Sequence, residues 1–143
     1  MQPLDHFYVC HHDEALAEGV LLPSGACAVS WNGTAHSHGV FPSFAMFQGI
    51  QNRLSGRLIK HSTASDRLYS KTFYLQRNED WSGISGTGLV AVGFEFEQIT
   101  MLHWLGKDGS TFWYESVDLV EQVHGHEGRT VIVRCAVPQT VGA

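Results

Sequence analysis

An internal repeat constrains the fold of this chain more than any other feature. Shifting the sequence by 73 residues aligns identical residues at five places and keeps the apolar or polar character between them. The identical pairs are Trp31 with Trp104, Gly33 with Gly106, Ser37 with Ser110, Ser43 with Ser116, and Ile59 with Ile132. Upstream, the aromatic run at 6–9 aligns with 72–75 at an offset of 66. We therefore predict two tandem, diverged units.

Each unit shows the same order of predicted elements: four strands, a helix and a last strand. Strands are expected at 7–10, 19–22, 26–31, 39–41 and 57–60, and again at 73–76, 89–96, 100–104, 111–114 and 130–136. Ser43 and Ser116 stand where helix N-caps belong, and Gly125 is expected to end the second helix in the left-handed conformation. The pattern predicts an α+β fold, mainly antiparallel sheet, with both units packed as one compact body.

The segment 62–66 is the linker-like stretch between the units, which we place at 1–66 and 67–143. Units of this size are marginal when they fold alone, so we expect them to share a core. Uncovered sheet edges also favour a homodimer.

The composition is typical of a soluble globular protein, with 43% hydrophobic and 16% charged residues. A net charge of −5 disfavours a nucleic-acid partner, because a nucleic-acid footprint needs a basic surface. No apolar run is long enough for a membrane helix, and the first residues do not resemble a signal peptide. Three widely spaced cysteines predict free thiols and a cytoplasmic location.

The nine histidines include three close pairs, at 11–12, at 36 and 38, and at 124 and 126. Two histidines on one face of a strand can form half of a metal site, although surface or structural histidines are the more common case. The sequence carries no cofactor motif, and we predict neither a cofactor nor a metal.

A glycine- and hydroxyl-rich segment at 82–88 separates two predicted strands of the second unit. Its glycines can turn backbone N–H groups toward one point, which suits a phosphate or another anion. The residues that carry this hypothesis are Ser82, Gly83, Ser85, Gly86 and Thr87. A flexible connection is the alternative, because the segment matches neither a Walker A motif nor a Rossmann fingerprint.

Charged residues flank this segment. Arg77 and Asp80 stand just before it, and Arg77 could hold an anion or pair with a neighbouring carboxylate. His124 and His126 lie at the predicted helix end, where they could contact a ligand or serve as a structural cap.

The second unit resembles a group of small uncharacterised proteins of actinobacteria, archaea and their phages. The resemblance rests on R-N-E-D-x-S-G-x-S-G-T-G at 77–88, on Trp104, on Ser110 and Thr111, and on H-G-H-x-G-x-T at 124–130. It covers residues 72–134 and implies a map of a site rather than an activity, adding Ser110 and Thr111 to the candidate residues. The first unit departs from this pattern at 11–15 and 51–57, so it would be a structural partner or bind something different.

Three hypotheses for function follow. The first is a non-enzymatic, phage- or mobile-element-type protein that sequesters a small anionic, nucleotide-like ligand. The alternative is an inhibitor that blocks a larger host protein through an aromatic surface, such as Phe112 or Trp113, or a sheet edge. A histidine-dependent hydrolase comes third, because the sequence shows no nucleophile motif.

Overall fold

The computed structural model describes residues 2–33, 37–63, 66–78, 87–107 and 109–136. Within these ranges the first half of the chain forms β1 (His6–His11), β2 (Glu14–Leu21), β3 (Cys27–Trp31), β4 (His38–Phe41), α1 (Phe44–Asn52) and β5 (Arg57–His61). The rest forms α2 (Asp66–Lys71), β6 (Thr72–Arg77), β7 (Gly88–Glu95), β8 (Thr100–Trp104), β9 (Thr111–Tyr114), α3 (Val117–His124), a 3-10 turn (His126–Gly128) and β10 (Thr130–Arg134).

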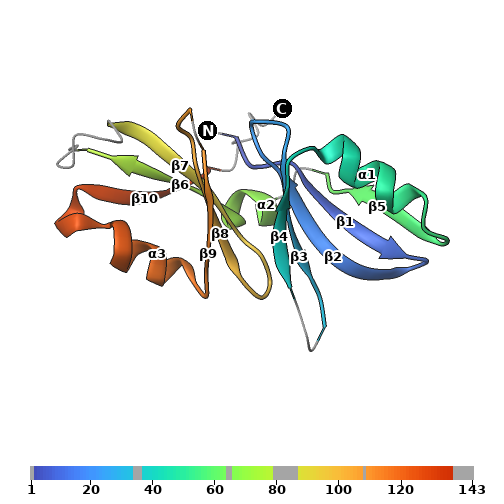
Figure 1. The fold of residues 1–143 in the computed structure, drawn as a ribbon. Coiled ribbons are helices and arrows are strands. Elements are labelled where there is room, and N and C mark those ends of the chain that lie inside the picture. The colour runs from blue at the N-terminus through green and yellow to red at the C-terminus, as the bar shows by residue number, and fades with distance from the viewer. Residues whose placement is uncertain (1, 34–36, 64–65, 79–86, 108, 137–143) are drawn as a thin grey trace, which may run out of the picture.

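The strands form two antiparallel sheets with the same topology. The first sheet has the order β4-β3-β2-β1-β5, and the second has the corresponding order β9-β8-β7-β6-β10. In each sheet the helix connects the two edge strands and covers one face, α1 in the first and α3 in the second (Figure 1). The predicted α+β fold of two tandem units is thus confirmed.

Each helix covers a core built from equivalent positions. The first sheet packs Phe7, Val9, Ala17, Val29 and Ile59 under Phe47 of α1. The second sheet packs Phe73, Leu75, Ala91, Leu102 and Ile132 under Val120 of α3. Both helices begin at the predicted serines, since the Oγ atoms of Ser43 and Ser116 accept the N–H groups of Met46 and Leu119.

A phenylalanine packed on a glycine recurs in both sheets. Phe7 pairs with Gly19 across β1 and β2, and Phe73 pairs with Gly93 across β6 and β7. A Cβ atom at either glycine would overlap the facing ring. Both first strands also carry an irregularity in the same place, two residues beyond the phenylalanine. The repeat therefore extends to the details of backbone geometry.

The two sheets contact each other through the faces that the helices leave free, which we call the inner faces. Val20 and Ala28 of the first sheet share a buried core with Phe94 and Met101 of the second. The segment before β1 joins this contact, because Leu4 N–H donates to Thr72 Oγ1 at 3.2 Å. The predicted shared core is present.

The structure differs from the predicted elements in several places. Helix α2 was not predicted, because six residues are too few to show helical periodicity. Strand β2 begins at Glu14 rather than 19, because its first two residues are exposed and give no apolar signal. Gly125 is right-handed (φ −63°), so the predicted left-handed helix end is wrong. Glu127 and Gly128 take the left-handed positions instead. Within the described ranges, none of the helices combines the length and apolar character needed to cross a membrane.

The glycine positions under the phenylalanine rings give a prediction. Gly19→Ala and Gly93→Ala should each lower the free energy of unfolding by roughly 1–3 kcal/mol, because the added methyl group displaces a fully buried ring. Urea denaturation measures the effect. Gly39→Ala in β4 is the control, since a Cβ atom there meets nothing within 4 Å. Equal effects at all three positions would contradict the packing argument.

Candidate functional site

Arg77 occupies a buried position at the end of β6. Its side chain is 5% exposed, its Nε donates to Thr130 Oγ1 at 3.3 Å, and its guanidinium lies 5.8 Å from the centre of the Trp104 ring. A cation over an indole face is an attractive arrangement. The sequence singled out Arg77 as a candidate ligand-binding residue, but it gave no signal that Trp104 and Thr130 would surround it.

His124 lies next to the same tryptophan. Its ring meets the Trp104 ring edge-on at 5.0 Å, and its Nε2 shares a hydrogen bond of 2.8 Å with the Tyr114 hydroxyl. Burial raises the pKa of Tyr114, so its hydroxyl stays protonated at neutral pH. The structure thus places both Arg77 and His124 next to the Trp104 ring.

The first sheet has a similar arrangement that involves a different strand. Arg57 of β5 lies 5.9 Å from the Trp31 ring and donates to Gln51 Oε1 at 2.7 Å. Arg57 pairs with His11 across β1 and β5, whereas Arg77 of β6 pairs with Thr130 of β10. An arginine over the tryptophan is therefore common to both units, which favours a structural role for this contact.

Of the other predicted residues, Thr111 lies on the other face of the sheet from this cluster, and Ser110 contacts Trp104 through its backbone. Consecutive strand residues face opposite sides of a sheet, so Trp104 is on the helix-covered face and His103 is on the inner face. Thr111 pairs with His103, and its Oγ1 lies 2.9 Å from His103 Nδ1. The Ser110 carbonyl accepts the N–H of Trp104 in the β8–β9 turn, and Thr87 is exposed before β7.

The rest of the predicted site lies outside the described residues. This applies to Asp80, Ser82, Gly83, Ser85 and Gly86, and to the side chain of His126. The anion-binding hypothesis for the segment 82–88 therefore stays a prediction.

A cavity of about 550 Å³ opens on the inner face of the first sheet, and we call it the inner-face cavity. Its volume lies in the range of small-molecule sites. It is lined by His6, Tyr8 and Cys10 of β1, Glu18 of β2, Lys60 of β5, Leu68 and Lys71 of α2, and Phe94 of β7, and also by Asp13, Ala15, His61, Ser62 and Thr63. Most of these residues come from the unit whose site was expected to be missing.

One cross-strand row forms the floor of the inner-face cavity. Tyr8 pairs with Glu18 on one side and with Lys60 on the other, so three polar side chains stand next to one another. Glu18 is 5% exposed and its Oε1 lies 3.8 Å from Nε2 of His6. The sequence reasoning missed these residues, although a carboxylate within the apolar run of β2 was a usable signal.

Cysteine chemistry distinguishes the cavity from the cores. The described cysteines are all free and buried, and Cys10 lines the cavity. Burial raises the pKa of Cys27 to about 11 and also raises that of Cys135, which makes both poor nucleophiles.

The described part of the chain holds no group of three or more potential metal ligands.

The fold is that of a small α+β protein of two related units. Part of its sequence is similar to a phage protein family. Residues 70–136 match the model of a protein family described as Acb5 phage protein. The match spans β6–β10 and α3, and it supports a small phage-like protein, in agreement with the resemblance over 72–134. No curated protein and no solved structure matches the chain.

His103 gives a prediction for the pH dependence of stability. Its ring is 9% exposed, and burial lowers its pKa below the ordinary 6.5. On acidification the unfolded chain therefore takes up a proton at this position before the folded chain does. The stability present above pH 6.5 should fall as the pH drops below it.

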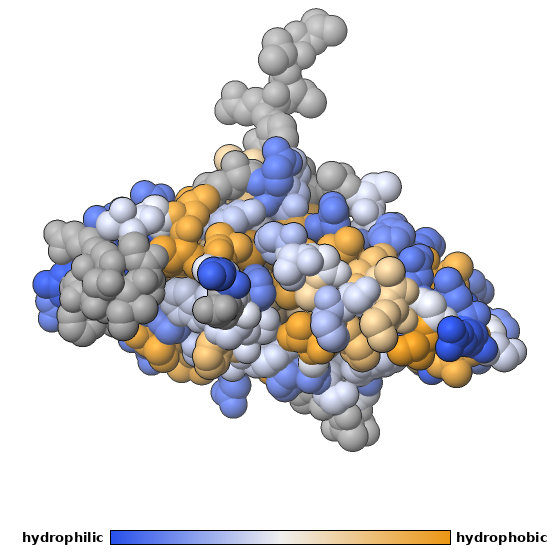
Figure 2. Space-filling model, turned by 45° about the horizontal axis from the view of Figure 1, so that its top comes forward, coloured by the Kyte–Doolittle hydropathy of each residue, from blue (hydrophilic) through white to orange (hydrophobic). Residues whose placement is uncertain are grey.

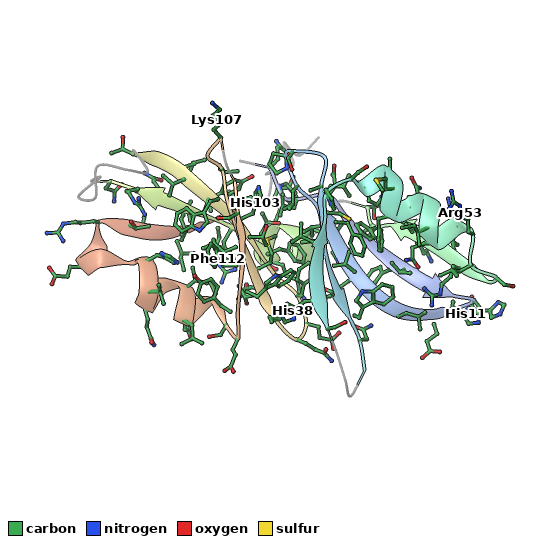
Figure 3. All side chains as sticks on the ribbon, viewed as in Figure 1. His11, His38, Arg53, His103, Lys107 and Phe112 are labelled. Atoms are coloured by element: carbon green, nitrogen blue, oxygen red, sulfur yellow. The ribbon has the colours of Figure 1, made fainter. Side chains whose placement is uncertain are left out.

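Urea midpoints at pH 7.5 and 5.5 measure this change. The fall in midpoint should be smaller in His103→Gln than in the wild-type protein, whereas His11→Gln, at an exposed position, should leave it unchanged (both residues are labelled in Figure 3). The same fall in all three proteins would show that His103 is not responsible.

Proposed function

We propose that this is a non-enzymatic binding protein that sequesters a small anionic, nucleotide-like ligand, and that the ligand occupies the inner-face cavity. The observation that carries the proposal is the cavity itself, which combines suitable volume, aromatic and polar lining groups and two lysines. The similarity of residues 70–136 to a phage family is compatible with a protein that acts by binding.

The two lysines supply the positive charge. Lys60 extends from β5 and Lys71 from the last turn of α2, so the cavity has an ammonium group on each of two elements. A flexible ammonium group binds phosphate as a point charge with three hydrogen-bond donors. Both side chains retain contact with solvent, so their contribution should weaken as salt is added.

The affinity for nucleotides should depend on these lysines. Lys60→Ala and Lys71→Ala should each weaken binding of a nucleoside monophosphate about tenfold, which corresponds to one charge-assisted hydrogen bond. Isothermal titration calorimetry with the four ribonucleoside monophosphates measures this change. Lys107→Ala is the matched control, because Lys107 is an exposed lysine in the β8–β9 turn and does not line the cavity (Figure 3).

The same titration tests where on the protein the nucleotide binds. Unchanged affinity in both lysine variants, with loss of binding in Arg77→Ala, would place the ligand at the segment 82–88 and overturn the cavity assignment. Absence of binding to every nucleotide would contradict the proposed function itself.

Cys10 provides an independent measurement of occupancy. A maleimide at pH 7.5 should modify Cys10 faster than Cys27, whose pKa of about 11 leaves little thiolate. A bound nucleotide should slow the modification of Cys10, because this residue lines the cavity. Mass spectrometry of peptides reports each cysteine separately. Equal modification of Cys10 with and without a saturating nucleotide would contradict binding in the cavity.

A specific contact also favours the hydrolase hypothesis as a second candidate. Ser62 Oγ lies 2.8 Å from Nδ1 of His6, and the other ring nitrogen of His6 faces Glu18. A hydroxyl, a base and a carboxylate in this order are the groups that a serine hydrolase uses. Chromatography of the nucleotide after incubation with the protein distinguishes the two candidate functions. A binding protein leaves the nucleotide intact, whereas a hydrolase cleaves it. Hydrolysis should then be lost in Ser62→Ala.

An exposed apolar surface on α1 supports the inhibitor hypothesis. The outer side of α1 exposes Met46, Ile50 and, just beyond the helix, Leu54, and the helix itself carries no charged residue. On the face shown in Figure 2, hydrophobic surface lies on both halves of the molecule, including the half that carries α1. An inhibitor acting through this surface would lose its protein target in Ile50→Glu while keeping its affinity for nucleotides.

A further inference from the structure

The buried carboxylate of Glu18 has an acceptor atom without a donor. Among the described residues, Glu18 Oε1 has no hydrogen-bond partner, and Nε2 of His6 lies 3.8 Å away, beyond hydrogen-bond distance. A buried carboxylate accepts hydrogen bonds only, and leaving its oxygens without donors is costly. Because Glu18 also lines the inner-face cavity, a ligand with N–H groups can reach this carboxylate and relieve that cost.

Aromatic rings next to Glu18 form a wall suited to a planar ligand. His6 stacks on Phe94 with ring centres 5.4 Å apart, and Tyr8 meets His6 edge-on at 4.8 Å. These three side chains line the cavity together with Glu18. Nucleobases stack on such rings and are recognised by hydrogen bonds at their edges.

The second sheet lacks this combination at the equivalent positions. Tyr74 occupies the place of Tyr8, but its neighbours across the strands are Val92 and Val133 instead of Glu18 and Lys60. Val92 is buried in the core between the sheets. Polar residues that the fold itself required would recur in both units, so Glu18 and Lys60 point to a ligand bound by the first unit.

We propose that Glu18 selects a guanine base, so that the ligand of the inner-face cavity is a guanine nucleotide. This inference rests on the proposed function. Guanine presents two adjacent donors, N1–H and the N2 amino group, which match the two acceptor oxygens of a carboxylate. Adenine presents a lone pair at N1, which a carboxylate repels. Lys60 and Lys71, which line the same cavity, then bind the phosphate.

Calorimetric titration of the full chain with GMP, IMP and AMP tests this proposal. The wild-type protein should bind GMP about tenfold more tightly than AMP, with IMP between them because it keeps N1–H and lacks the N2 amino group. Glu18→Gln should reverse this order, since the amide can donate to adenine N1 and accept from its N6 amino group. Lys107→Ala should keep the wild-type order.

The outcomes separate the base selectivity from the proposed function. Equal affinity of the wild-type protein for GMP and AMP would overturn the role of Glu18 while leaving nucleotide binding intact. Binding of none of the three nucleotides would overturn both. The comparison of GMP, IMP and AMP in the wild-type protein needs no variant, so it decides the question even where Glu18→Gln fails to fold.

Discussion

The contact between the two sheets is the interaction on which the rest of the molecule depends. Each sheet buries one face under its own helix, and a unit of this size is marginal on such a core alone. The shared core of Val20 and Ala28 against Phe94 and Met101 supplies the missing burial. It covers the cross-strand row that contains Val20 but leaves the next row, with Tyr8 and Glu18, facing a cavity. The same partial coverage therefore stabilises the fold and leaves the inner-face cavity open.

Duplication explains how polar groups can occupy such a position. The helix-covered faces of the two units keep the same phenylalanine, glycine and tryptophan positions, because those residues determine the packing of the unit. The inner faces have diverged. Val92 fills the core between the sheets, whereas Glu18 at the corresponding place contacts His6 and the cavity. One unit can thus supply apolar surface for stability while the other carries charged groups that a core would exclude.

The sequence predicted the features that repeat and missed those that do not. The order of elements along each unit and both serine N-caps followed from the repeat, with Trp31 matching Trp104 and Ser43 matching Ser116, since local patterns of alternation and capping determine them. Arg77 and His124 were singled out, but their shared neighbour Trp104 depends on strand pairing across 27 positions of the sequence (77 to 104). Glu18 and Lys60 come together only because β1 lies between β2 and β5. Single-sequence periodicity carries no information on that arrangement.

The position of the cavity determines which of its residues belong to the segment that is similar to other proteins. The family match covers residues 70–136, which supply Lys71 and Phe94 to the cavity but not Glu18, Lys60 or His6. A protein that shares only this segment shares the second sheet and the surroundings of Trp104, and it lacks the floor of the cavity. Ligand selectivity that depends on Glu18 would therefore be a property of the first unit. The segment similar to the phage family would then contribute mainly the apolar wall, through Phe94, and one lysine of the phosphate side.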